Sequence, residues 1–267
     1  MKKGLMGLAI AICSIYLLIC TAFYFYQESF IFHPRELEQD YQYKFSVDFD
    51  EKMYDTPNAG KINALHFKAE NSKGVVFYLH GNAGCLDDWG WLYQDFLPRG
   101  YDLLIIDYRT YGKSTGKMSE QNLFGDIQYI YDDLAQQYDE SQIIVYGRSI
   151  GTGMATKVAS DNNPKHLILE TPYYNLNDVV KRVIPIFPTR LLLRYPLPSN
   201  ENILKVDCPI HIIHGTNDNV IKYQSGENLA ACVGEEKCTF ITVEGGEHNN
   251  LSGFIQYSQL LADVLEK

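Results

Sequence analysis

The sequence predicts an α/β domain with a mostly parallel, doubly wound sheet of about eight strands, preceded by one N-terminal transmembrane helix. Three observations support this prediction. Several short runs are continuously apolar, as in strands that are covered on both faces. Helix-like segments alternate with these runs, which is typical of a parallel sheet. The chain also has 267 residues, 46% of them hydrophobic, which is enough for one large domain with an appendage.

The N-terminal segment has the length and composition of a membrane span. Lys2 and Lys3 precede roughly twenty apolar residues without a charge, as a bilayer core requires, and aromatic residues follow at 23–26. A cleaved secretory signal would have a shorter apolar region and an Ala-x-Ala-like site, whereas residues 20–22 read Cys-Thr-Ala. We therefore expect residues 1–28 to be an uncleaved signal anchor. The paired lysines predict a cytoplasmic N-terminus and an extracytoplasmic domain at 29–267.

The sheet is expected to begin with a pair of antiparallel strands. Residues 41–48 alternate apolar with polar, which predicts a half-exposed strand, and residues 62–67 alternate in the same way. Asn-Ala-Gly at 58–60 reads as the turn between them. This entrance to the sheet should resemble a hairpin.

The rest of the chain alternates between buried strands and helices. We expect strands at 75–79, 103–106, 143–145, 167–169, 210–213 and 239–243, and helices at 86–97, 120–137, 151–160, 225–233 and 253–265. In the second helix the apolar residues recur every three or four positions and therefore share one face. Ligands of such sheets bind at the carboxyl ends of the strands, and the motifs described next all fall there.

A Gly-x-Ser-x-Gly pattern, Gly-Arg-Ser-Ile-Gly at 147–151, lies between an expected strand and an expected helix. This context is that of a nucleophile elbow, a turn so tight that side chains two residues from the serine would collide. Glycine removes that collision. The serine oxygen would then stand clear of the sheet at the positive end of a helix, where a developing oxyanion is favoured. We predict Ser149 as the nucleophile, against the alternative of a glycine-rich turn with a chance serine.

A serine hydroxyl needs a base, and the base needs a carboxylate to orient it. Of seven histidines, only His248 follows the last expected strand and precedes the last helix, as the base does in the chain order serine, acid, histidine. Asp218, directly after the strand at 210–213, is the predicted acid, although its Thr-Asn-Asp-Asn context also suits a plain turn. Glu170, at the end of the preceding strand, is the rival acid. We favour Asp218 because its strand immediately precedes the histidine loop.

An oxyanion hole needs two backbone N–H donors. One is expected from Ile150, the residue after the nucleophile. The other should come from His-Gly-Asn-Ala-Gly at 80–84, whose glycines let the loop curl toward the serine. Asn82 is the predicted donor and Ala83 the open alternative, and His80 is expected to brace the loop through hydrogen bonds.

Together these residues resemble the serine α/β-hydrolases, and most of all the membrane-anchored branch with the bud-emergence-type proteins and the animal protein depalmitoylases. The landmarks are the motifs at 80–84, 107–114, 147–151, 214–218 and 246–248. The resemblance runs from about residue 30 to the C-terminus. It implies an α/β-hydrolase fold, a Ser149–His248–Asp218 triad and a single N-terminal membrane segment. It implies no single substrate, because the branch includes esterases, thioesterases and lipid hydrolases. Arg148 stands where many lipases have histidine, which hints at an anionic or polar group near the nucleophile.

Residues 173–198 are the expected cap insert. They follow Glu-Thr-Pro at 170–172, where this fold commonly inserts a lid, and they are apolar, with prolines that break them into short pieces. An apolar insert beside an active site suggests an acyl or aryl substrate. The alternative is that these side chains pack on the core or lie on the membrane surface.

Composition limits the remaining functions. A net charge of −10 without a basic block argues against a nucleic-acid partner. No cysteine or histidine spacing suggests a metal, and no phosphate-binding loop suggests a cofactor, so we expect neither. Cys232 and Cys238 would close a small disulfide loop if the domain is exported.

The sequence thus predicts a membrane-anchored serine hydrolase that cleaves a carboxylic ester or thioester of a small or lipid-like acyl substrate through an acyl-enzyme. Two other functions compete with it. A peptidase on the same fold is disfavoured because the sequence holds no propeller-like domain. A catalytically inactive binding protein is disfavoured because it has no need of a complete triad.

Overall fold

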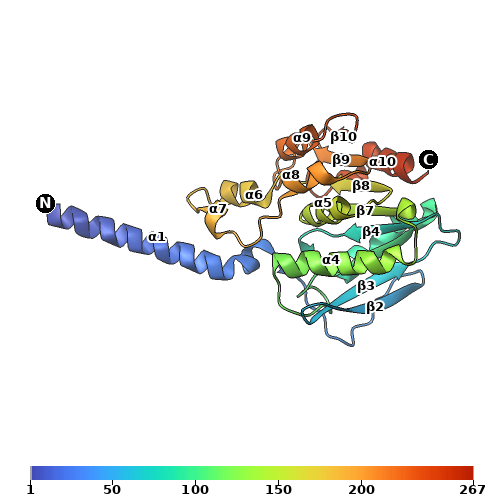
Figure 1. Cartoon of the computed structure of the whole chain (residues 1–267), viewed down its shortest axis with the longest axis horizontal. Helices are drawn as coiled ribbons and strands as arrows, with labels where there is room; N and C mark the ends of the chain where they lie inside the picture. Colours follow the sequence, from blue (N-terminus) through green and yellow to red (C-terminus); the bar gives the residue numbers. More distant parts are fainter. Residues whose placement is uncertain (1, 267) are drawn as a thin grey trace.

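The structure is a computed structural model that describes residues 2–266. Across these residues, eight strands form one twisted sheet in the order β10-β9-β8-β7-β4-β6-β3-β2 (Figure 1). Its pairs are parallel except β2 with β3 and β3 with β6. The strands are β2 (Phe49–Thr56), β3 (Gly60–Phe67), β4 (Val75–Leu79), β6 (Asp102–Ile106), β7 (Ile143–Arg148), β8 (His166–Glu170), β9 (Ile210–Gly215) and β10 (Cys238–Val243). The predicted sheet of about eight mostly parallel strands is confirmed. A separate short pair joins β1 (His33–Pro34) to β5 (Ala83–Gly84).

Helices cover both faces of the sheet. Along β4, Val75, Phe77 and Leu79 pack into one core cluster, while Val76 and Tyr78 pack into a second on the other face. The first cluster includes α4 (Glu120–Ala135), α5 (Gly151–Asp161) and α9 (Tyr223–Ala231), and the second includes α3 (Tyr93–Phe96) and α10 (Ile255–Leu265). A strand buried on both sides has no polar face, which explains the continuous apolar runs in the sequence.

The entrance to the sheet differs from the prediction in one strand. The hairpin is present, but β2 lies at Phe49–Thr56, and residues 41–48 form no strand. Tyr43 is buried in the second core cluster, and Tyr41, Phe45 and Val47 pack against it. The alternation in this segment therefore comes from a coil that lies along the core.

The helix expected at 86–97 is also broken. It consists of α2 (Leu86–Trp89), α3 and 3₁₀ turns at Gly90–Leu92 and Leu97–Arg99. A Cβ at Gly90 would overlap the ring of Phe45, so this position needs glycine, a poor helix former. The coil at 41–48 thus packs, through Phe45, against the point at Gly90 where the helix is broken.

The N-terminal helix α1 (Lys2–Ile31) projects from the domain, and α6 (Leu176–Val183) and α7 (Thr189–Leu192) lie along its C-terminal half (Figure 1). Among residues 2–266 it is the one helix that is long and apolar enough to cross a membrane. Only 6% of its apolar 18-residue stretch is buried against the rest of the protein. Cys20, Phe23 and Phe187 form a small buried cluster between α1 and the segment at 173–198. Cys232 and Cys238 are free thiols in this structure.

The turn between β7 and α5 has the geometry of the predicted elbow. Ser149 has a φ of 53°, a left-handed conformation that costs free energy in a residue with a side chain. A Cβ on Gly147 would lie 2.6 Å from the Cβ of Ala155, and a Cβ on Gly151 would overlap the carbonyl oxygen of Leu79 in β4. Both positions therefore need glycine for lack of space.

Two matched glycine substitutions test this packing. Gly151→Ala should lower the free energy of unfolding by about 1–3 kcal/mol, because backbone of β4 and α5 must move apart. Gly125→Ala, in the middle of α4, should raise it by about 0.5–1 kcal/mol, because a Cβ there meets no described atom within 4 Å. Urea unfolding of the two variants measures both effects. Equal stabilities for Gly151→Ala and wild type would contradict the packing at the elbow.

Candidate active site

The three predicted triad residues meet at the carboxyl end of the sheet. The Nε2 atom of His248 lies 2.9 Å from the Oγ atom of Ser149, and its Nδ1 atom lies 2.7 Å from Oδ2 of Asp218. Ser149 is 8% exposed and His248 9% exposed, so the two reacting groups are largely screened from water yet reachable. A serine, an imidazole and a carboxylate in this line have the geometry for passing a proton from the hydroxyl to the ring.

The carboxylate of Asp218 is held in place by donors on all sides. Its Oδ1 atom accepts hydrogen bonds from the backbone N–H groups of Val220 and Ile221, each at 2.8 Å. Its Oδ2 atom faces His248 and also Nε2 of His214, at 3.3 Å. Burial alone would raise the pKa of Asp218, but the hydrogen bonds from His214 and His248 outweigh it and hold the pKa well below the usual range. The acid therefore stays ionised beside the imidazole.

His214 is a site residue that the sequence reasoning did not assign. It is fully buried, and its Nε2 atom lies 3.0 Å from the carbonyl oxygen of Ile221. This contact places a hydrogen on Nε2, which then also faces Asp218. The spacing of four residues between His214 and Asp218 was the available signal, but it acquires meaning only once the turn brings the two side chains together.

The rival acid Glu170 has other partners. It accepts a hydrogen bond from the Tyr146 hydroxyl at 2.8 Å and lies 3.4 Å from Nε of Arg148. The guanidinium of Arg148 also donates to Asn249, the neighbour of His248, and lies over the ring of Trp89. Burial would lower the pKa of Arg148, but the charge of Glu170 outweighs it and raises the pKa. The charge of Arg148 is thus already matched within the protein, which weakens the hint of an anionic substrate group.

The two predicted oxyanion donors both border the pocket at Ser149. Within residues 2–266, neither the backbone N–H of Asn82 nor that of Ile150 donates to another group. The hydroxyl of Tyr111 donates to the carbonyl oxygen of Asn82 at 2.6 Å, and that of Tyr108 donates to the carbonyl oxygen of His80 at 2.8 Å. The carbonyl groups of Asn82 and His80 are therefore engaged, while the N–H group of Asn82 stays available.

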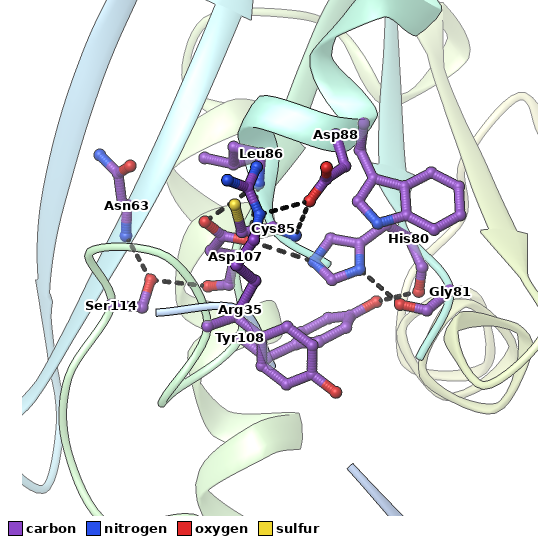
Figure 2. A network of polar contacts seen from close by, with 12 residues as sticks. Arg35, Asn63, His80, Gly81, Cys85, Leu86, Asp88, Asp107, Tyr108 and Ser114 are labelled. Atoms are coloured by element: carbon purple, nitrogen blue, oxygen red, sulfur yellow. Dashed lines mark hydrogen bonds and ion pairs between the residues drawn. The ribbon is translucent and has the colours of Figure 1, made fainter. Parts of the chain in front are cut away.

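A polar network, buried at its centre and exposed at Arg35 and Asp88, supports this loop (Figure 2). Its centre is the fully buried Asp107, which accepts from the backbone N–H of Leu86 and lies 3.4 Å from Nε2 of His80. Burial raises the pKa of Asp107, and the nearby imidazole of His80 opposes that rise. Asp88 accepts from the N–H of Cys85 and from Arg35, which connects the network to the chain after α1. His80 thus braces the loop.

A pocket of about 450 Å³ opens in front of Ser149. Much of its wall is apolar and comes from two parts of the chain, α1 (Phe23, Phe30, Ile31) and α6 (Leu176, Val180, Val183). Trp89 also borders it. These α1 residues were not predicted to belong to the site, although Phe23, Phe30 and Ile31 are spaced to share one helix face. Among the described residues that line the pocket, none is an aspartate or glutamate.

Sequence comparisons identify proteins that are similar to this chain. A sequence model of the family described as "Hydrolase_4: Serine aminopeptidase, S33" matches residues 70–200. "Lysophosphatidylserine lipase ABHD12" of Danio rerio is 30% identical over 190 residues, 63% of this chain and 49% of that protein. "Uncharacterized protein Rv2307c" of Mycobacterium tuberculosis is 32% identical over 202 residues, 74% of this chain and 72% of that protein. The match therefore spans about half the length of the lipase.

Solved structures share the fold. Esterase Pf2001 of Pyrococcus furiosus has a TM-score of 0.71 at 19% identity, over 88% of this chain and 98% of its own. Est1E of Butyrivibrio proteoclasticus, solved with ferulic acid, has a TM-score of 0.64 at 16% identity, over 81% of this chain and 100% of its own. With the sequence matches, this likeness of fold leads to one assignment: the chain belongs to the serine hydrolases of the α/β-hydrolase fold.

Proposed function

We propose that this protein hydrolyses a carboxylic ester or thioester with a lipid-like acyl group, with Ser149, His248 and Asp218 as its catalytic triad. The observation that carries the proposal is the continuous line of hydrogen bonds, 2.9 Å from Ser149 to His248 and 2.7 Å from His248 to Asp218, beside an apolar pocket. The oxyanion donors are the backbone N–H groups of Asn82 and Ile150.

In the first half of the reaction, the Oγ atom of Ser149 forms a bond to the substrate carbonyl carbon while its proton passes to Nε2 of His248. The carbonyl oxygen becomes an oxyanion, which the two backbone N–H groups stabilise. Asp218 accepts the Nδ1–H hydrogen bond of His248 and stabilises the imidazolium. The tetrahedral intermediate then collapses, the bond to the leaving oxygen or sulfur breaks, and His248 returns the proton to the leaving group.

In the second half, water attacks the acyl-serine carbonyl. His248 takes a proton from this water and then gives it to Oγ of Ser149 as the free acid leaves. Each proton that His248 accepts is thus passed on, and the enzyme returns to its starting state. Every step uses groups of this chain and water.

Two features favour an acyl ester over a peptide. The family model carries the name of a serine aminopeptidase, but a free peptide amino group needs an acidic partner, and no described residue of the pocket is acidic. The apolar walls instead suit an acyl chain. The relatives named as a lysophosphatidylserine lipase and an esterase act on this bond type by name. An inactive binding protein is disfavoured because the strained Ser149 conformation is costly without a catalytic use.

The placement in the cell follows from the N-terminal helix. We propose that residues 1–28 form a single-pass signal anchor with a cytoplasmic N-terminus and that the hydrolase domain at 29–267 lies on the other side, as the paired lysines suggest. Residues 173–198 serve as the cap. The apolar helix and the order of motifs support membership of the membrane-anchored bud-emergence and depalmitoylase branch.

Replacement of the nucleophile tests the reaction itself. Ser149→Ala should abolish labelling by a fluorophosphonate probe and lower kcat on p-nitrophenyl esters at least about 10⁴-fold, because no acyl-enzyme can form. Ser160→Ala, on the half-buried side of α5, is the matched control and should keep both properties. Undiminished ester turnover by Ser149→Ala would refute the proposed nucleophile.

Replacement of the acid gives a pH-dependent result. Asp218→Asn should lower kcat by roughly 10³- to 10⁴-fold, because the amide does not stabilise the imidazolium or fix its tautomer.

The folded-state pKa of Asp218 is lowered, so the unfolded chain binds a proton at this residue at higher pH than the folded chain. Asp218 thus stabilises the fold above about pH 4, and this contribution is lost on further acidification.

The measurement is the difference in unfolding free energy between wild type and Asp218→Asn, followed from about pH 6 to about pH 3. It should shrink as the pH falls. Asp207→Asn, whose side chain is 88% exposed, serves as the control and should show no such trend. A difference that grows toward acid pH would contradict the lowered pKa.

A further inference from the structure

The membrane helix contributes directly to the pocket in front of the nucleophile. Phe23, Phe30 and Ile31 of α1 border the same cavity as Ser149 and His248. The ring centroid of Phe23 lies 4.2 Å from that of Phe187 and 5.7 Å from that of Phe30. An anchor that served only to tether the domain would have no need to reach the reaction site.

Specific polar contacts fix α1 against the segment at 173–198. Gln27 is completely buried in the middle of this contact. Its amide nitrogen donates to the carbonyl oxygen of Leu192 at 3.1 Å, and its amide oxygen accepts from the N–H of Arg194 at 2.7 Å. One turn of helix from the pocket, Glu28 accepts from the Tyr195 hydroxyl at 2.7 Å and pairs with Arg194 at 2.9 Å. A buried glutamine with both ends satisfied fixes one rotation and one height of the helix.

The contact between α1 and the segment at 173–198 lies at the height where α1 is expected to leave the hydrocarbon core of the membrane. From Gly4, about twenty helical residues span the ~30 Å hydrocarbon core, which places Phe23 near its edge. Beside α1 (Figure 1), the segment at 173–198 exposes large apolar side chains, among them Val183, Ile186 and the 83% exposed Leu191. Exposed apolar groups next to a membrane helix are suited to lie in the interface.

We infer that α1 forms one wall of the acyl-binding site and that the substrate is a membrane-resident acyl ester or thioester whose chain enters from the bilayer along α1. This inference rests on the proposed hydrolase function. A long acyl chain that moves from lipid directly into the apolar pocket does not pass through water. The free-energy cost of exposing its methylene groups to water therefore does not arise. Phe23 and Phe30 then determine which chains fit.

A pair of tryptophan substitutions on α1 tests the wall. In full-length protein in nanodiscs, Phe23→Trp should lower the ratio of kcat/KM for p-nitrophenyl dodecanoate to that for p-nitrophenyl acetate about tenfold, because the larger ring fills space for the chain. Phe25→Trp changes the same residue type on the exposed side of α1, where the side chain is 67% exposed, and should leave the ratio unchanged. Phe30→Trp, at the exposed rim of the pocket, is the second variant if the first does not fold.

Equal ratios for the pocket-facing variants and Phe25→Trp would overturn the role of α1. That outcome is distinct from failure of the proposed function, in which acetate turnover by the wild type would not depend on Ser149. The acetate reaction is therefore measured in parallel with Ser149→Ala.

A vesicle experiment tests the route of entry. A fluorogenic long-chain acyl ester is placed either in the vesicles that contain the enzyme or in separate vesicles. Turnover should occur when both share one bilayer and should be at least about tenfold slower when the substrate must cross water. Equal rates in the two arrangements would overturn entry from the bilayer, because the substrate would then reach the pocket through water.

Discussion

The parallel pairing of β4 with β7 is the constraint on which the rest of the site depends. Leu79 lies opposite Gly147, so both strands end at the same level and the chain leaves them as adjacent loops. The first turn of α5 then passes so close to the end of β4 that residue 151 has no room for a Cβ. The same register brings Ser149, in its left-handed conformation, next to the loop at 80–84 that contains Asn82.

The acid and base are positioned by a second pair of neighbouring strands. β9 and β10 end together, and the loops that follow are joined by hydrogen bonds from Thr216 to Val243 and from Asn217 to Gly246. These bonds hold the loops of Asp218 and His248 together without any contact to Ser149. Asn249 then connects this unit to Arg148 beside the nucleophile, which ties the two halves of the site together. The line of hydrogen bonds depends on these loop contacts, since the loops themselves have no regular structure.

The sequence predicted what local sterics and periodicity control. The apolar runs predicted the buried strands, and the glycines around Ser149 predicted the turn. Both patterns lie within a few consecutive residues, so they can be recognised without knowledge of distant contacts. It did not predict features that need two distant segments. Residues 41–48 alternate like a strand, yet Tyr43 and Phe45 pack against a helix broken at Gly90, and no local pattern encodes that contact. His214 likewise had no visible role until Asp218 and Ile221 surrounded it.

The proposed role of α1 in the pocket is also encoded by a contact between distant segments. The high hydropathy of α1 predicts a membrane helix but does not indicate that the helix also lines the pocket. Phe23 reads as part of an aromatic belt, and any apolar residue would satisfy the bilayer at that height. The informative residue is Gln27. A buried amide is costly unless a partner satisfies it, and here the backbone of Leu192 and Arg194 does so. Gln27, one turn from Phe23 and Phe30, therefore acts with its neighbour Glu28 to dock α1 on this domain, at the height where the aromatic face of α1 closes the pocket.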